Sequence, residues 1–154
     1  MKNYMKIIFL VILMLVFSRI NAQPIQNVYV FAENADEDFN KCNLSNEGLL
    51  ASARSTLRYN RISNAEIGNS DLSLYIRATV LPTGQGFCAT YVHLEFYKMS
   101  PINIPKGRLW GSHVLCGKGS LTTAAIQNTQ TRLNDSVRSL TDRCITEIED
   151  KLNK

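Results

Sequence analysis

Three segments with period-two alternation, in quick succession between Asp71 and Gly117, constrain the fold of this chain most strongly. From Leu72 to Val80, aliphatic residues alternate with polar and aromatic ones, so the aliphatic side chains share one face of a strand. The segment from Cys88 to Tyr97 repeats this pattern, and the segment from Arg108 to Cys116 supplies a third strand. The sheet that they form therefore has one apolar face, which needs a cover.

The connections between these segments carry proline and glycine. The stretch from Pro82 to Gly86 suits a hairpin loop of more than two residues. The stretch from Ser100 to Gly107 holds two prolines, which cannot donate to a strand ladder, and it is predicted as a connection. The glycine-rich and threonine-rich stretch from Gly117 to Thr123 is predicted as the connection to a last helix.

Two helices and one further strand flank this meander. A short β-branched and aromatic run, Val28 to Phe31, predicts a first strand. Ser45 is a good cap for a helix from about Asn46 to Tyr59, with Glu47 in the first turn where the helix dipole favours an acid. A second apolar stripe with helical spacing predicts a long helix from about Gln127 to Asp150.

The order of elements indicates an α+β fold. We expect a mainly antiparallel four-stranded sheet, ordered β-α-β-β-β-α, with both helices on one face and disulfides as additional ties. A right-handed crossover makes the first strand parallel to the strand that begins near Leu72. The opposite sheet face is expected to stay open to solvent.

The first 22 residues have the features of a secretory signal. Lys2 and Lys6 precede an apolar run from Ile7 to Phe17, and a small residue, Ala22, stands at the expected cleavage site. The run is shorter than the roughly 20 residues that span a bilayer. We therefore expect a signal peptide over residues 1–22, one domain over residues 23–154, and no transmembrane segment after cleavage.

Charge argues against a nucleic-acid partner. Removal of the three basic residues of the signal leaves 14 basic against 13 acidic residues, so the formal charge falls from +4 to about +1. A charge this small gives no electrostatic attraction to nucleic acid or to an anionic membrane.

The four cysteines, Cys42, Cys88, Cys116 and Cys144, survive cleavage, and an even number in an exported chain predicts two disulfides. We therefore expect a periplasmic or secreted protein. Cys42 precedes the first helix and Cys88 opens the strand at the same end of the sheet, which predicts a Cys42–Cys88 disulfide.

The second pair, Cys116 and Cys144, poses a geometric problem. A helix that starts beside Cys116 would carry Cys144 roughly 25 Å away, whereas a disulfide tolerates about 7 Å between Cα atoms. Either the loop at residues 117–126 travels back across the sheet before the helix begins, or these two cysteines are not paired with each other. We favour the travelling loop, because free thiols are less expected in an oxidising compartment.

A resemblance rests on four features, namely the Cys42 to Ser45 helix start, the Leu72 to Val80 strand, Cys88 with Val92 and Leu94, and Trp110. With these features the chain resembles a family of small exported bacterial proteins of unknown function. Its layout is also similar to small α+β modules of the bacterial envelope, such as the amino-terminal domain of the Tol-system propeller protein. The resemblance implies a fold and a location in the envelope, and it implies no chemistry.

Catalytic patterns are weak in this sequence. The Gly117 to Ser120 stretch lacks the first glycine and the hydroxyl residue of a phosphate loop, and neither a Gly-x-Ser-x-Gly elbow nor a His-Glu-x-x-His pair occurs. In one register His93 and His113 would lie within reach across the ladder, beside Glu95. This cluster is the basis of an alternative hypothesis, a small metal-dependent or acid–base hydrolase.

The polar sheet face is the stronger candidate for function. Tyrosine and arginine are favoured at interfaces, and Trp110 is expected in the core because of its large apolar area. We therefore expect an exported, non-enzymatic binding or accessory protein with no cofactor or metal, and an envelope protein or glycan as partner. A third hypothesis is an inhibitor of a secreted enzyme. The predicted binding surface consists of Tyr75, Arg77, Tyr91, His93, Glu95 and Tyr97.

Overall fold

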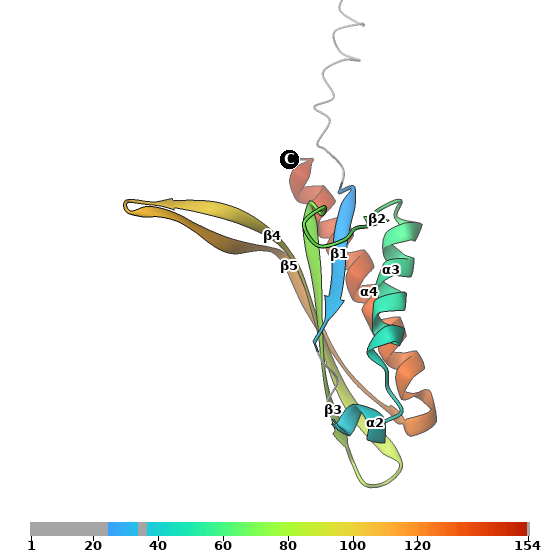
Figure 1. Ribbon diagram of the computed structural model, residues 1–154. Coiled ribbons are helices and arrows are strands. Elements are labelled where there is room, and N and C mark those ends of the chain that lie inside the picture. The colour runs from blue at the N-terminus through green and yellow to red at the C-terminus, as the bar shows by residue number, and fades with distance from the viewer. Residues whose placement is uncertain (1–24, 34–36, 154) are drawn as a thin grey trace, which may run out of the picture.

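The computed structural model describes residues 25–33 and 37–153, so the predicted signal peptide lies outside the described residues. The fold is α+β, with a five-stranded mixed sheet in the order β2-β1-β3-β4-β5 and helices packed on one side of it (Figure 1). The strands are β1 (Asn27–Ala32), β2 (Ser63–Asn64), β3 (Leu72–Pro82), β4 (Phe87–Ile104) and β5 (Gly107–Ala125). The helices are α2 (Glu37–Lys41), α3 (Asn46–Tyr59) and α4 (Ile126–Leu152).

The sheet topology matches the expected crossover and adds one strand. β1 is parallel to β3, with Val28 opposite Leu72, and α3 lies in the connection between them. β3, β4 and β5 form an antiparallel meander, as predicted. The prediction of four strands is wrong by one, because Ser63 and Asn64 form the short strand β2, parallel to β1. Two residues without a periodic pattern give no strand signal.

The predicted connection from Ser100 to Gly107 is also wrong. β4 continues as a strand to Ile104 and turns at Pro105 and Lys106 directly into β5. β3 pairs with β4 only as far as Tyr97, so no strand of the described residues lies beside the outer edge of β4 beyond that residue. A proline without an N–H is tolerated at such a free edge.

The predicted connection from Gly117 to Thr123 belongs to β5, which runs on to Ala125. This strand solves the geometric problem of the second disulfide. β5 travels nine residues beyond Cys116, about 30 Å, before α4 begins at Ile126, and α4 returns about 27 Å to Cys144. The disulfides are Cys42–Cys88 and Cys116–Cys144, with Cα–Cα distances of 6.1 and 5.6 Å.

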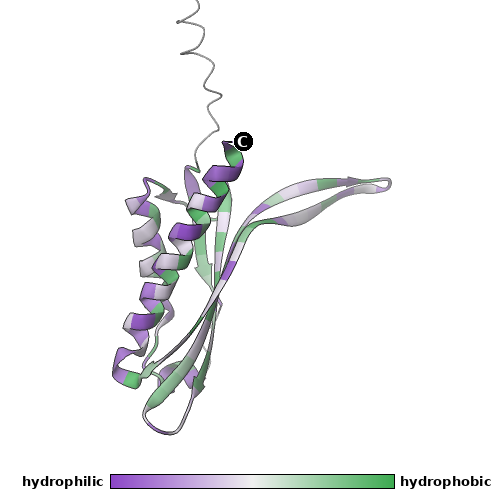
Figure 2. Cartoon of the chain, turned by 180° about the vertical axis from the view of Figure 1, so that it is seen from behind, coloured by the Kyte–Doolittle hydropathy of each residue, from purple (hydrophilic) through white to green (hydrophobic). Residues whose placement is uncertain are grey.

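The core lies between the sheet and the two long helices, α3 and α4, which cover the same face as predicted (Figures 1 and 2). Ser45 caps α3 by accepting a hydrogen bond from the Gly48 amide at 3.2 Å, which satisfies one of the free N–H groups of the first turn. The largest fully buried side chains include Leu49, Leu57, Leu74, Ile76, Leu94, Phe96, Leu133 and Val137.

Candidate functional site

Two exposed surfaces meet on the side of the sheet away from the helices. The first, here called the open face, consists of side chains from three adjacent strands. They are Tyr29 and Phe31 on β1, Tyr75 and Arg77 on β3, and Tyr91, His93, Glu95 and Tyr97 on β4. The second, here called the arm, is the outer part of the β4–β5 hairpin, residues 98–114, which extends away from the body (Figure 1).

An aromatic cluster forms one half of the open face. The ring of Phe31 lies 5.5 Å from that of Tyr29, 5.2 Å from that of Tyr75, and 6.3 Å from that of Tyr97, between ring centroids. Aromatic contacts at these distances, along β1 and from β1 to β3 and β4, stabilise a sheet surface. The rings are only partly buried, so they present apolar area to solvent.

Charged groups border this cluster. The Nε of Arg77 lies 3.0 Å from Oε2 of Glu33, a pair of exposed side chains that contributes little stability by itself. Partial burial and the nearby Glu33 carboxylate raise the pKa of the Tyr75 hydroxyl above its ordinary value. The Tyr75 hydroxyl can donate a hydrogen bond.

The other half of the open face runs toward the β5 edge. His93 and Glu95 lie opposite Gly119 and Gly117, and the rings of Tyr91 and His93 stack at 6.4 Å. A side chain at Gly119 would overlap the ring of Tyr91. The glycine therefore leaves room for the tyrosine ring across the edge strand, so Gly119 is a packing requirement within β5 and not part of the connection that the sequence predicted.

The structure does not assemble the predicted histidine cluster. His93 lies opposite Gly119, whereas His113 lies opposite Lys98 on the arm, six residues away along β5 or roughly 20 Å. His93 and Glu95 do come together, with Nε2 and Oε1 at 3.8 Å. Within the described ranges, no group of three or more His, Cys, Asp or Glu side chains is placed to hold a metal ion.

The six predicted surface residues all lie on the open face, because the predicted phase of β3 and β4 is right. The register places Tyr75 opposite Glu95 and Arg77 opposite His93. Tyr29 and Phe31 were not included in the prediction. The alternation of β1 predicts their position, because Val28 and Val30 are buried and the residues between and after them project to the opposite side of the sheet.

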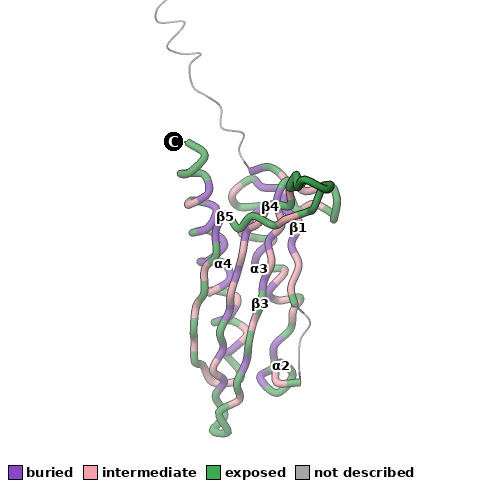
Figure 3. The backbone as a smooth tube through the Cα atoms, turned by 90° about the vertical axis from the view of Figure 1, so that its left-hand side faces the viewer, coloured by how far each residue is buried: buried purple, intermediate pink, exposed green. Residues whose placement is uncertain are grey.

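The arm is the feature that the sequence analysis did not foresee. From Lys98 to Ile104 and from Gly107 to His113, the two strands pair with each other and with no other strand in the described part of the chain. Almost every residue of the arm is exposed (Figure 3), including the only tryptophan of the chain. The prediction that Trp110 is a core residue is wrong, because 71% of its surface is exposed.

Both sides of the arm carry exposed apolar side chains. Residues directly opposite in an antiparallel pair project to the same side. The side that continues the open face therefore holds Met99, Trp110 and Val114, next to Tyr97. The other side holds a second set, Ile102, Ile104 and Leu109.

A β-bulge marks the base of the arm. Phe96 pairs with Cys116 but Tyr97 pairs with Val114, so Leu115 is an extra residue in β5. Such a bulge bends the strand and leaves backbone groups out of the ladder. The carbonyl of Leu115 accepts a hydrogen bond from Nζ of Lys151 at 3.1 Å, which ties the arm base to the end of α4.

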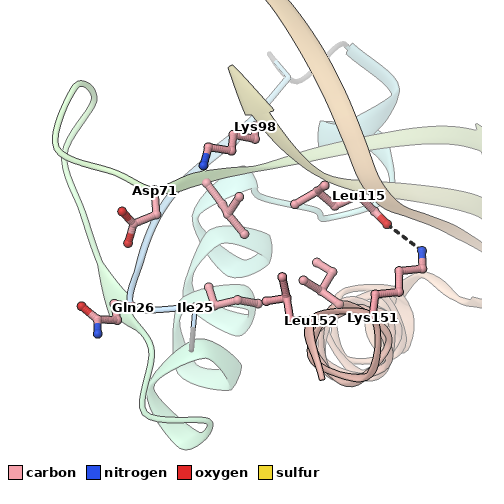
Figure 4. Close-up of a pocket in the computed structure, with 9 residues that line it drawn as sticks. Ile25, Gln26, Asp71, Lys98, Leu115, Lys151 and Leu152 are labelled. Atoms are coloured by element: carbon pink, nitrogen blue, oxygen red, sulfur yellow. Dashed lines mark hydrogen bonds between the residues drawn. The ribbon is translucent and has the colours of Figure 1, made fainter. Parts of the chain in front are cut away.

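A cavity of about 410 Å³ opens beside this base, between the start of β1, the start of β3 and the end of α4 (Figure 4). Its wall is mainly aliphatic, with Gln26, Asp71, Lys98 and Lys151 at the polar rim. Lys151 is paired with Glu147 at 2.8 Å. The aliphatic residues are Ile25, Leu72, Leu115, Ile148 and Leu152.

None of the helices in the described part of the chain is both long and apolar enough to cross a membrane. No protein-family model and no curated protein matches the chain.

Three solved structures are distantly similar to the chain. A PelC dodecamer from Paraburkholderia phytofirmans is 15% identical, with a TM-score of 0.42, and the match covers 81% of this chain and 86% of that one. A minor lipoprotein from Acinetobacter baumannii is 11% identical, with a TM-score of 0.32 and coverage of 84% and 91%. A lipoprotein from Caulobacter crescentus is 9% identical, with a TM-score of 0.32 and coverage of 82% and 87%. Similarity at this level does not assign a function.

Proposed function

We propose that this protein is an exported, non-enzymatic binding module of the bacterial envelope that holds a protein partner on its open face. The observation that carries this proposal is the continuous surface of partly exposed aromatic rings from β1, β3 and β4. Tyrosine and phenylalanine supply large contact area with few rotamers to restrict, which is why interfaces favour them.

The polar groups around these rings suit recognition. Arg77, His93 and Glu95 provide donors and acceptors beside the aromatic cluster, and their present pairs are exposed or loose. Exposed ion pairs can exchange partners at small cost. A flat surface of this kind suits a folded protein better than a small substrate, which needs a concave site.

The two disulfides support the location. Disulfides form and persist in oxidising compartments, and they are rare in the cytosol of mesophilic bacteria. Cys42–Cys88 ties the turn between α2 and α3 to β4, and Cys116–Cys144 ties β5 to α4. A protein with this construction suits the periplasm or the extracellular space.

Site-specific photo-crosslinking in the native host tests the proposal. A benzoylphenylalanine in place of Tyr91 or Tyr75 is expected to capture one discrete protein partner. The matched control is Tyr59, a tyrosine on α3 with 87% of its surface exposed and far from the open face in the fold. Equal crosslinking from Tyr59 and Tyr91, or none from either open-face position, would contradict the proposal.

A further inference from the structure

The two edges of the sheet are protected to different degrees. A free strand edge carries unpaired N–H and C=O groups, and proteins commonly shorten it, cover it, or place proline, a bulge or a free charge on it. The β2 edge follows this rule, because β2 has only two residues. The opposite edge is β5, which runs from Gly117 to Ala125 over about 30 Å with no proline and no bulge.

The backbone groups of this edge point away from the sheet at alternate residues. The Ile126 amide donates to the Gly86 carbonyl at 3.0 Å, so the pair next to Phe87 and Ala125 is of the hydrogen-bonded type. The two types of pair alternate along an antiparallel ladder, and residues of the other type turn their N–H and C=O groups outward. In β5 these residues are Gly117, Gly119, Leu121 and Thr123. No strand of the described residues lies beyond them.

The one charged side chain in this part of β5 does not block the edge. Lys118 projects toward the helices, where its Nζ lies 2.6 Å from Oε2 of Glu147 on α4. A free lysine on an edge opposes pairing with another strand, whereas this lysine is held in an ion pair. None of the residues from Gly117 to Ala125 is buried. The edge is therefore open to a further strand.

A polar groove of about 310 Å³ lies between this edge and α4. Arg132 and Arg143 of α4 line it, and both are exposed and without an ion-pair partner among the described residues. Asp135 also lines the groove, but its carboxylate is already paired with Arg138 at 3.3 Å. The hydroxyl groups of the groove come from Ser120 and Thr122 on β5 and from Ser136 and Ser139 on α4.

The groove has the length and the charge to receive part of an extended peptide. Arg132 and Arg143 are 11 residues apart on α4, about 16 Å, which is the length of roughly five residues of a strand. A strand added to β5 would project alternate side chains over the groove, and acidic ones would complement the two arginines. Its other side chains would lie beside Leu121, which has 73% of its surface exposed and suits apolar neighbours.

We propose that the β5 edge binds an extended segment of a partner protein by strand addition, and that this segment carries acidic side chains at alternate positions. The outward backbone groups between Gly117 and Thr123 supply the hydrogen bonds, and the groove beside α4 recognises the side chains. The edge is a different surface from the open face, so this inference does not depend on the function proposed above.

Fluorescence anisotropy of the mature chain with two labelled hexapeptides tests the proposal. One peptide alternates glutamate with valine, and the other alternates lysine with valine. The glutamate peptide is expected to bind at least about tenfold more tightly, because only its side chains complement Arg132 and Arg143. Equal affinity for the two peptides, or no binding of the glutamate peptide, would overturn the inference.

Leu121→Pro tests the backbone pairing. Proline removes an outward N–H and no bond to β4, so the fold is expected to be kept. The affinity for the glutamate peptide is expected to fall at least about tenfold. Leu121→Ala removes the same side chain but retains the N–H, so it is the matched control and is expected to bind almost as tightly as the wild type. Unchanged binding by Leu121→Pro, or an equal loss in both variants, would overturn strand addition.

Charge reversal tests the groove. Arg132→Glu combined with Arg143→Glu is expected to reverse the preference, so that the lysine peptide binds more tightly than the glutamate peptide. Arg58→Glu changes an exposed arginine on α3 outside the groove and is expected to retain the wild-type preference. A double variant that still prefers the glutamate peptide would overturn the inference.

Sedimentation of the wild type without peptide distinguishes a partner strand from a second copy. Dimers that Leu121→Pro abolishes, together with no peptide binding, would overturn the inference in favour of pairing between two β5 edges. Circular dichroism and mapping of both disulfides check the fold of each variant, and Thr123→Pro, at the next outward position, replaces Leu121→Pro if that variant does not fold. A chain that binds neither peptide but still crosslinks from Tyr75 refutes strand addition alone.

Discussion

Single residues on β3 and β4 are sorted into two environments by the strand phase. Leu74 and Leu94 are fully buried, while the neighbouring Tyr75 faces the open side. Leu74→Asp or Leu94→Asp is expected to lower the free energy of unfolding by about 3–5 kcal/mol, because each buries a charge without a partner. Tyr75→Ala is expected to cost much less, roughly 1 kcal/mol. Urea unfolding of the three variants measures these changes. Equal losses in the free energy of unfolding would show that the assignment of buried and exposed positions on β3 and β4 is wrong.

Glu147 on α4 is predicted to make stability depend on pH. Hydrogen bonds from Lys118 on β5 and from Lys151 lower the pKa of its carboxyl to about 2. In the unfolded chain this pKa is about 4.3. The stability that the ionised carboxylate contributes is therefore fully present above about pH 4.5, and it is lost as the pH falls toward 2.

Glu147→Gln is accordingly expected to lower the melting temperature at pH 7 and to flatten the fall in stability between about pH 4.5 and 2. Thermal melts at several pH values measure both effects. Glu149→Gln, which removes an exposed carboxylate from the same helix, is the control. Its melting temperature is expected to fall with pH as steeply as that of the wild type. The same steepness in Glu147→Gln would contradict the lowered pKa of Glu147.

At the scale of elements, the arm is predicted to be dispensable for the fold of the body. Lys98 and His113 lie opposite each other at its base, so residues 99–112 can be replaced by an Asn-Gly turn. We expect this variant to fold, to form both disulfides, and to melt within a few degrees of the wild type. Failure to form the disulfides in peptide mapping would show that the arm contributes to the folding of the body.

The contrast between the body and the arm explains how much of the fold the sequence predicted. β3 and the inner half of β4 pack one face on the core, so burial imposes a period of two that is visible in the sequence. In the arm both sides are exposed, and no period distinguishes Ile102 from Trp110. Pro101 and Pro105 then indicate a connection, because local propensity is the only signal that remains between Ser100 and Gly107.

The open face was predictable for the same reason, and the histidine cluster was not. Residues that alternate with the buried positions along β3 and β4 project to the other face of the sheet and share a surface. This argument placed Tyr75 and Glu95 correctly. The relation of His93 to His113 depends on the register between β4 and β5. That register follows from the length of the hairpin, and the hairpin was misread as a long connection.

At the scale of the whole molecule, two bridges tie the helical layer to the sheet. Cys42–Cys88 joins the segment before α3 to β4, and Cys116–Cys144 joins β5 to α4, with sequence separations of 46 and 28 residues. Replacing either pair by alanine is expected to lower the free energy of unfolding by about 2–4 kcal/mol. Denaturant unfolding measures this, and a loss below about 0.5 kcal/mol for either pair would contradict the expectation.

The short turn of the β4–β5 hairpin also sets the order of events during folding. Its strands are joined by a two-residue turn, whereas the pairing of β1 with β3 joins Val28 to Leu72, which is 44 residues away in the sequence. A hairpin closes in about 1–10 μs, and distant pairings are slower because more chain entropy is lost first. We therefore expect a newly synthesised chain to expose its apolar hairpin before its core has closed, so neighbouring chains can make contact while each is still folding.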